Sequence, residues 1–339
     1  MITLQIVWYL LVGVLLTGYA ILDGFDLGAG FWHLIVKKDS ERRLFLNAIG
    51  PVWDGNEVWL ITGGGALFAA FPPVYASVFS GMYLALILLL FGLILRAVSL
   101  EYRSQLESPR WREWWDKAFA VGSMLAALLF GVALGNILRG LPLNENGDFT
   151  GTFFTLLNPY ALLIGLLGFA MIAFHGALYL AMKVEGDLAQ RLRGWANATW
   201  RIYLALFALV GVVSAATQPQ LFANYLEQPV LFVAPLLAGT MIVLAGVFNR
   251  KGREVSAFLC SSLGIVGLWG MVGAALFPNL VPALNDPALS LTLTNSSSGP
   301  VTLKTMLVIA VVFVPIVLGY TAFVYRSFAG KVSLEKGEY

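Results

Sequence analysis

Long apolar segments recur along the whole chain and are separated by shorter polar stretches. Most of them reach or approach the roughly 20 residues that a helix needs to cross the hydrocarbon core of a bilayer. The pattern predicts nine membrane-spanning helices near residues 6–36, 53–71, 74–100, 117–138, 158–182, 200–217, 229–248, 255–277 and 305–326. The second segment is the least typical, because it is short, polar at its start and rich in glycine.

The composition agrees with this pattern. Hydrophobic residues make up 59% of the chain and charged residues only 12%, whereas about a quarter of a soluble globular domain is charged. We therefore predict an all-α polytopic membrane protein in which residues 1–339 form a single integral membrane domain. No basic tract suggests a nucleic-acid partner. The first apolar segment lacks the basic start of a signal peptide, so we expect it to be retained as a helix.

The distribution of Lys and Arg over the loops predicts the orientation. With nine crossings, the basic loops KKDSERR, EYRSQLESPRWREWWDK, KVEGDLAQRLR and NRKGRE all lie on one side, while the other side receives little more than Arg139 and Lys304. An excess of basic residues marks the cytoplasmic side. The amino terminus is thus expected outside and the carboxyl terminus in the cytoplasm. Without the second crossing, the first basic loop would lie opposite the others.

A weak internal similarity suggests a duplicated unit. When residues 11–24 are aligned with residues 163–176, Gly13 matches Gly165, and Asp23–Gly24 matches His175–Gly176. Internal repeats are common in membrane proteins. We expect two four-helix bundles, residues 1–138 and 158–277, followed by one additional helix at 305–326.

Four carboxylic acids lie inside segments that otherwise predict membrane helices: Asp23, Asp26, Asp54 and Glu57. Acids in a membrane are unfavourable unless they are paired, hydrated or protonated, so such a cluster is a functional hypothesis. Residues three apart share a helix face, which gives one pair on each of the first two spans. A proton path that begins near the cytoplasmic surface is one interpretation. Pairing with a nearby arginine, or capping of the second span by Asp54, is the structural alternative.

Arg96 lies late in the third predicted span, where a buried guanidinium needs an anion or must extend toward the interface. Glu101 follows on the same helix and is a candidate charge partner. An arginine that simply reaches the membrane surface is the alternative.

The only two histidines, His33 and His175, limit the cofactors that the chain can hold. Haem iron is usually bound by His, Met or Cys, so two histidines on separate helices could hold at most one haem. His175 could be a ligand or a hydrogen-bonded core residue. Cys260 is the single cysteine, and no metal site or hydrolytic motif is visible. We expect no metal and no catalytic residue in this chain.

Glycines at helical spacing predict close helix packing. Gly131 and Gly135 form a GxxxG motif, and glycines recur at positions 264, 267, 270 and 273. Such small-residue faces let two helices approach closely.

Several strings together carry a family resemblance: DGFDLGAG, WDGNEVWLITGGGALFAAFPPVYA, LEYRSQ, WREWWD, GNILRGLP, LLNPYALLIGL and HGALYL. They cover nearly the whole chain, which strongly resembles subunit II of the cytochrome bd-type quinol oxidases. The resemblance implies a complex whose subunit I carries haem b, haem d and the quinol site. That complex would reduce dioxygen to water and take up protons from the cytoplasm without pumping them.

The resemblance implies that this chain is the haem-free partner in a bacterial or archaeal cell membrane, surrounded by lipids. Asp54, Asp23 and Asp26 match residues associated with the proton route in relatives. Relatives often have Gln where Glu57 stands and Arg-Pro where Arg96-Ala97 stands, so Glu57 is not expected to be required. A structural quinone or lipid is the one cofactor left open for this chain, and a small single-helix accessory subunit is left open as a partner.

Two other functions use the same residues. A proton-coupled secondary transporter would also need buried acids, but it would place polar ligands in both halves. The four acids all lie in the first half, which disfavours this alternative. A purely structural role would assign the acids to folding and assembly.

Overall fold

The computed structural model describes residues 2–334, and this part of the chain is mainly helical. Within it, 8 helices are long and apolar enough to cross a membrane, which confirms an all-α polytopic membrane protein. They are α1 (Ile2–Ile35), α5 (Tyr83–Tyr102), α6 (Pro109–Arg139), α7 (Pro159–Lys183), α8 (Gly186–Thr217), α10 (Val233–Arg250), α11 (Glu254–Leu276) and α12 (Pro300–Ser327).

Shorter elements connect these helices. They are α2 (Asp39–Ile49), α3 (Trp53–Ala70), α4 (Pro72–Gly81), α9 (Ala223–Glu227), the 3₁₀ helices η1 (Arg103–Gln105), η2 (Phe153–Leu157), η3 (Pro219–Phe222), η4 (Pro229–Phe232) and η5 (Pro287–Leu289), and the strands β1 (Asn279–Val281) and β2 (Leu291–Thr292). The two strands pair antiparallel, with Asn279 opposite Thr292. Asn285 exchanges two hydrogen bonds with the backbone of Leu143, so the loop that follows α6 and the loop that follows α11 contact each other.

The second predicted span corresponds to α3, which lies outside the group of eight long apolar helices because its first turns carry Asp54, Asn56 and Glu57. It packs along α1 in the opposite direction. Asn56 contacts Leu22 near the middle of α1, and Gly63 lies against Leu16. At its far end, the carbonyl oxygen of Ala70 accepts a hydrogen bond from the loop before α12.

The segment predicted as one helix over 74–100 is divided into α4 and α5. Gly81 ends α4 where a Cβ atom would lie 2.5 Å from Phe149 Cβ, and Met82 separates the two helices. Two other helices begin earlier than predicted. Residues 109–116 belong to α6 and residues 186–199 belong to α8, because charged residues form helices as readily as apolar ones once they leave the membrane.

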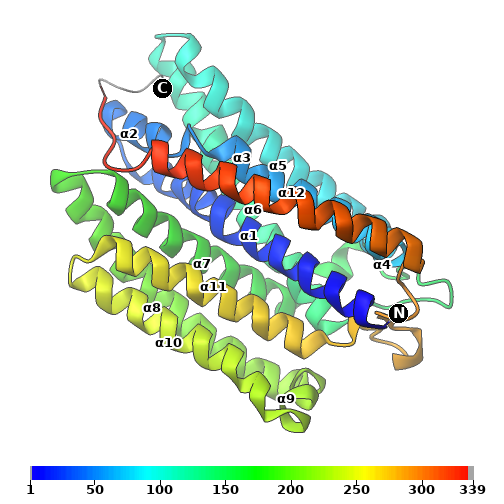
Figure 1. The fold of residues 1–339 in the computed structure, drawn as a ribbon. Helices are drawn as coiled ribbons and strands as arrows, with labels where there is room; N and C mark the ends of the chain where they lie inside the picture. Colours follow the sequence, from blue (N-terminus) through cyan, green and yellow to red (C-terminus); the bar gives the residue numbers. More distant parts are fainter. Residues whose placement is uncertain (1, 335–339) are drawn as a thin grey trace.

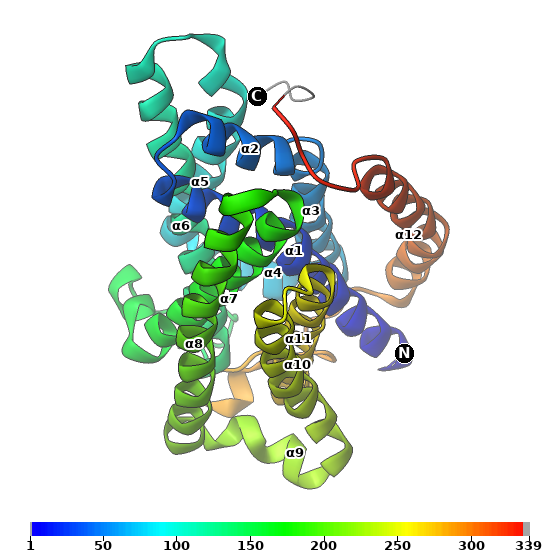
Figure 2. The ribbon, with the colours of Figure 1, turned by 90° about the vertical axis from the view of Figure 1, so that its left-hand side faces the viewer.

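The long helices lie roughly along one direction, with the first residues of α1 at one end and the last turn of α12 at the other (Figure 1). Helix α1 is central and contacts α3, α6, α7 and α11. Helix α12 lies on the outside beside α1 and α3, and Figure 2 shows it apart from the other long helices. Its apolar stretch is not buried against the rest of the described chain.

Glycines set the closest helix contacts. A Cβ atom on Gly28 of α1 would lie 2.8 Å from Gly176 Cα of α7. Cβ atoms on Gly131 and Gly135 of α6 would lie 2.7 Å from the Cα atoms of Gly165 and Ala161 in α7, respectively. The packing face predicted from the GxxxG motif is thus confirmed. Helix α7 is held tightly against both α1 and α6.

The contact between α1 and α7 gives a first prediction. Gly28→Ala should lower the Tm of the purified protein, because the added methyl group meets backbone atoms and forces the helices apart, at a cost of about 1–3 kcal/mol. Gly13→Ala is the matched control on the same helix, where nothing lies within 4 Å of the new atom. Thermal unfolding of both variants tests this, and equal Tm values would contradict it.

Candidate functional site

Arg96 joins three helices inside the bundle. Its Nη1 lies 2.6 Å from Asp23 Oδ1 of α1, and its Nη2 contacts Glu57 Oε1 of α3. Arg96 and Asp23 are both 0% exposed, so this arginine does not extend to the membrane surface. Three residues singled out from the sequence therefore come together in one site.

Asp26 lies one helical turn further along α1 and has a different partner. The Asn56 side-chain amide donates a hydrogen bond of 2.7 Å to Asp26 Oδ2 and also reaches the carbonyl oxygen of Leu22 at 3.1 Å. The Tyr325 hydroxyl donates to Asn56 Oδ1 at 2.9 Å. This chain of hydrogen bonds connects α12 to the acids through α3.

The charges of this site do not balance. The carboxyl groups of Asp23, Asp26 and Glu57 gather around the single guanidinium of Arg96. We call these four residues, with Asn56, the acid cluster. Asp23 Oδ2, Asp26 Oδ1, Arg96 Nε and the hydroxyl of the neighbouring Tyr19 have no hydrogen-bond partner among the described residues. Buried polar atoms in proteins are normally hydrogen-bonded, so these four atoms offer sites for water or exchangeable protons.

Asp54 is separate from the acid cluster. It lies in the first turn of α3 with its side chain exposed, while the Glu57 side chain turns toward Arg96 and is 23% exposed. Val52 occupies the N-cap position of α3 and makes no side-chain cap, so the suggested capping role of Asp54 is wrong. Asp54 lies in the first turn, where a carboxylate interacts favourably with the helix dipole. Glu57 therefore lies between the exposed acid and the buried ones.

The expected pairing of Arg96 with Glu101 is wrong. Glu101 is exposed at the end of α5, while Arg96 binds Asp23 and Glu57. Five residues along a helix correspond to a rotation of about 140°, so the two side chains leave α5 on different faces.

The two histidines differ in how fully their ring nitrogens are hydrogen-bonded. His175 is fully buried, with Nδ1 2.9 Å from Ser261 Oγ and Nε2 3.0 Å from the carbonyl oxygen of Ile21. Both of its ring nitrogens are thus occupied, as expected for a hydrogen-bonded core residue. The His33 ring is also fully buried; its Nε2 contacts Asp116, and its Nδ1 has no hydrogen-bond partner among the described residues.

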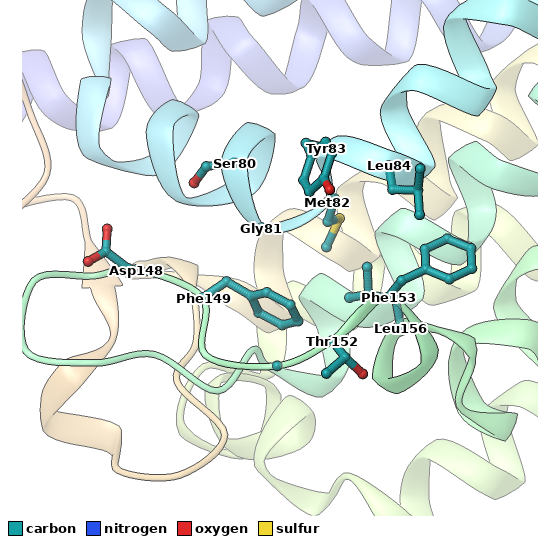
Figure 3. Close-up of a pocket in the computed structure, with 11 residues that line it drawn as sticks. Ser80, Gly81, Met82, Tyr83, Leu84, Asp148, Phe149, Thr152, Phe153 and Leu156 are labelled. Carbon is teal, nitrogen blue, oxygen red and sulfur yellow. The ribbon is translucent and has the colours of Figure 1, made fainter.

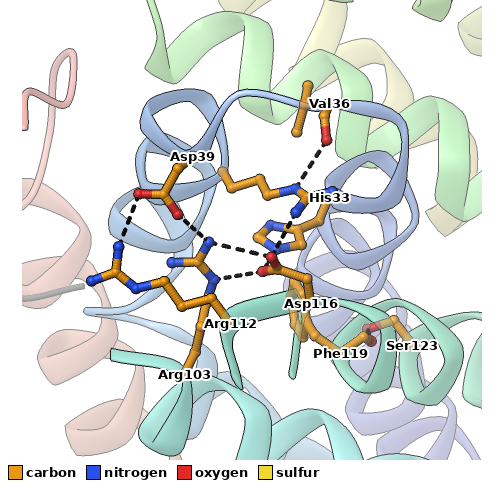
Figure 4. Close-up of polar contacts among 9 residues, drawn as sticks. His33, Val36, Asp39, Arg103, Arg112, Asp116, Phe119 and Ser123 are labelled. Carbon is orange, nitrogen blue, oxygen red and sulfur yellow. Dashed lines mark hydrogen bonds and ion pairs between the residues drawn. The ribbon is translucent and has the colours of Figure 1, made fainter. Parts of the chain in front are cut away.

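A second polar cluster lies at the end of the bundle where α1, α2, η1 and α6 meet (Figure 4). The buried Asp116 of α6 contacts His33, Arg42 Nη1 at 2.7 Å and Arg103 Nε at 2.5 Å. Asp39 in turn contacts Arg103 at 2.7 Å and Arg112 at 3.4 Å. These six residues are called the Asp116 network.

The sequence did not predict the Asp116 network, because its members come from four segments that each appear as solvated loops or helix ends. The one available signal was Asp116 itself, an acid within the aromatic string WREWWD.

A pocket at the junction of α4 and α5 lies away from both clusters (Figure 3). It has a volume of about 500 Å³, and its walls come from Ser80–Leu84 and from the loop that contains Asp148 and Phe149. None of the predicted site residues lines it.

Comparison with known proteins decides the family. A sequence model of cytochrome bd terminal oxidase subunit II matches residues 4–328. The chain belongs to this family. It is 40% identical to the cytochrome bd-I ubiquinol oxidase subunit 2 of Escherichia coli K12, over 98% of this chain and 96% of that one. It is also 32% identical to the cytochrome bd ubiquinol oxidase subunit 2 of Bacillus subtilis 168, over 98% of both chains.

A solved structure supports the fold. A chain of the bd oxidase from Geobacillus thermodenitrificans superposes with a TM-score of 0.79 at 16% identity, covering 96% of this chain and 98% of that one. Family membership confirms the resemblance carried by the DGFDLGAG and WDGNEVW strings. It also makes the chain a subunit of the cytochrome bd class of terminal oxidases and disfavours a transporter.

The geometry of the acid cluster predicts a strong requirement for Arg96. Arg96→Gln should sharply lower the amount of assembled protein in membranes, because removing one partner of a buried ion pair costs about 3–5 kcal/mol. Adding Asp23→Asn should restore part of the loss by removing a carboxylate that is left unpaired.

Arg201→Gln is the control, since Arg201 is exposed on α8. Quantitative immunoblots of solubilised membranes measure the result. Normal accumulation of Arg96→Gln alone would show that the buried pair is not needed for the fold.

Proposed function

We propose that this chain is the haem-free second subunit of an oxidase that takes electrons from a quinol and reduces dioxygen to water. The family match over residues 4–328 and the names of the relatives support this proposal. In this proposal haem b, haem d and the quinol site belong to the partner subunit. Both ring nitrogens of His175 and the Nε2 of His33 are held by protein groups, which agrees with that division.

We further propose that the acid cluster takes part in proton delivery to the oxygen site. The observation that carries this is that three carboxyl groups gather around one guanidinium within the bundle. A buried carboxylate without a cation is unfavourable and is neutralised by binding a proton. Asp26 has no cation among its hydrogen-bond partners, so it is the proton-holding member. Glu57 borders the passage between the exposed face of α3 and this interior, since its side chain is 23% exposed and contacts Arg96.

Asp54 supplies the entry to this route. It belongs to an exposed face of α3 that also contains Val58, Ile61 and Thr62. An acid facing lipid would be unfavourable, so we propose that the haem-bearing subunit covers this face together with the outer side of α12. Protons would then pass from Asp54 along the interface, beside Glu57, toward Asp26. A structural quinone or lipid and an accessory single-helix subunit remain predictions.

We also propose nine membrane crossings, with α3 as the second, the amino terminus outside and the carboxyl terminus in the cytoplasm of a bacterium. The antiparallel packing of α3 along α1 supports this proposal, and so does the gathering of basic loops on one side. The two proposed four-helix bundles correspond to α1, α3, α5 and α6 and to α7, α8, α10 and α11, with α12 as the additional helix.

Substitutions of the two neighbouring acids test the proton route. Asp54→Asn should lower quinol oxidase turnover about tenfold or more, because it removes the entry acid from a proton-transfer step. Glu57→Gln should retain most activity, since glutamine can still accept the hydrogen bond from Arg96. Glu101→Gln is the exposed control.

Oxygen consumption with a soluble quinol should be normalised to the haem content of the purified complex, which reports assembly. Full turnover in Asp54→Asn at normal haem content would remove Asp54 from the route. The assignment of the chain to the oxidase family would not change.

Thiol labelling in intact cells tests the topology. In a Cys260→Ala background, Ser40→Cys and Glu107→Cys should both be protected from a membrane-impermeant reagent, while Asn146→Cys should react. All three positions are exposed, so burial does not cause the protection. If α3 did not cross the membrane, positions 40 and 107 would lie on opposite sides, and labelling of only one of them would contradict nine crossings.

A further inference from the structure

His33 and Asp26 share one face of α1. They are seven residues apart, which is close to two full helical turns and corresponds to about 10 Å along the helix axis. His33 is fully buried and belongs to the Asp116 network, whereas Asp26 is buried and belongs to the acid cluster. One face of α1 therefore joins the two polar clusters of the bundle.

Gly30 lies on the same face of α1, about midway between His33 and Asp26. Opposite it, Ser123 of α6 is fully buried, and its hydroxyl donates a hydrogen bond of 2.8 Å to the carbonyl oxygen of Phe119. A Cβ atom on Gly30 would meet the Ser123 hydroxyl and would lie 3.4 Å from the Phe119 carbonyl oxygen. Two polar groups of α6 thus lie against α1 between the clusters.

Helix α6 carries a matching row of polar groups. Asp116 and Ser123 are also seven residues apart, and Figure 4 shows both with Phe119 on α6 beside His33. Asp116 contacts His33 at one end of the row, and Ser123 lies against Gly30 further along. The two rows therefore face each other across the contact between α1 and α6.

Each end of this path has a buried polar atom without a hydrogen bond. His33 Nε2 contacts Asp116, but His33 Nδ1 has no partner among the described residues, and the same holds for Asp26 Oδ1. Buried polar atoms are normally hydrogen-bonded, and ordered water often supplies the missing bond where the surroundings are polar. The path between the two atoms, which passes the Ser123 hydroxyl, is suited to such water.

The Asp116 network also reaches the surface of the protein. Asp116 borders a pocket of about 340 Å³, and so does Asp39, whose side chain is 47% exposed. The basic loops on this side of the bundle predict that it faces the cytoplasm. Cytoplasmic water can therefore come close to Asp116, which is in direct contact with His33.

We propose that His33 carries protons in a second inlet to the acid cluster. The inlet leads from the pocket through Asp116 to His33, and then past Ser123 to the acid cluster. This inference rests on the proposed role of the acid cluster in proton delivery. It adds an entry between α1 and α6 to the entry at Asp54 on α3.

Each passage along the inlet moves a proton and no electron. A proton that reaches Asp116 from the pocket passes to His33 Nε2, so that an O–H bond breaks and an N–H bond forms. The imidazolium then releases its Nδ1 proton to water, and this proton binds to Asp26. The neutral ring returns to its first tautomer before the next passage. Histidine is suited to this role because either ring nitrogen can bind or release a proton.

Turnover of the purified oxidase complex tests the inlet. Two parallel entries share the proton flow, so His33→Gln alone should lower oxygen consumption with a soluble quinol by less than about twofold. In the Asp54→Asn background, where the other entry is closed, His33→Gln should lower turnover by a further factor of about five or more. His175→Gln is the matched control, since His175 is equally buried but has both ring nitrogens hydrogen-bonded.

Ser123→Ala is a second test that leaves the Asp116 network whole, because it removes only the hydroxyl beside Gly30. It should also lower turnover in the Asp54→Asn background. Ser262→Ala is its control, since each of these serines donates to the carbonyl oxygen four residues earlier. All rates are normalised to haem content. Anaerobic reduction of the haems by quinol should be equal in all variants, because quinol oxidation releases protons rather than taking them up.

The possible results separate the inlet from the function on which it rests. Equal turnover of Asp54→Asn with and without His33→Gln would overturn the inlet, and so would a matching loss of anaerobic haem reduction, which would show a structural effect. If the His33 variant does not assemble, the result for Ser123→Ala decides. Full turnover in Asp26→Asn would instead remove the acid cluster from proton delivery. If Asp54→Asn alone keeps full turnover, His33→Gln alone should show the fivefold loss.

Discussion

The structure depends on how one guanidinium is shared among acids that cannot be exposed to lipid. Arg96 pairs with Asp23 and Glu57, which ties α5 to both α1 and α3. Because the arginine is fully buried, its desolvation must be offset by these contacts, and the geometry of three helices is fixed together. Asn56 extends the same constraint to Asp26 and, through Tyr325, to α12. The last helix therefore has a polar contact with the bundle even though its apolar stretch is exposed.

Close backbone contacts complement this polar constraint. Gly28 and Gly176 let α1 approach α7, and Gly131 with Gly165 does the same for α6 and α7. Without a hydrophobic driving force between helices in lipid, such contacts supply the packing energy. Helix α7 is therefore the common neighbour of α1 and α6 in these contacts. The acids of α1 are consequently enclosed by protein rather than by lipid, which is what permits them to be there.

Much of this could be predicted from local sequence. Apolar length gave most of the membrane helices, the spacing of Asp23 and Asp26 placed them on one face, and the GxxxG motif located a packing surface. The contacts that could not be predicted depend on which face of a helix a side chain occupies, or join residues from separate segments of the chain. Glu101 follows Arg96 closely in sequence but leaves α5 on another face. The Asp116 network gathers His33, Arg42 and Arg103 from separate segments, and no local pattern reports that contact.

Asp26 and Asp54 lie on opposite sides of Glu57 in different surroundings, one buried and one exposed. Asp26 is buried and hydrogen-bonded by the Asn56 amide, whereas Asp54 is exposed on α3 and lies outside the acid cluster. Glu57 connects the two environments, because its carboxylate binds Arg96 while part of its side chain stays exposed. A glutamine at position 57 would keep a hydrogen bond to Arg96 and lower the excess of carboxyl groups over guanidinium from two to one. The charge of the interior therefore depends on the residue at position 57, where the interior meets the exposed face of α3, and a substitution there can change this charge while it keeps the contact with Arg96.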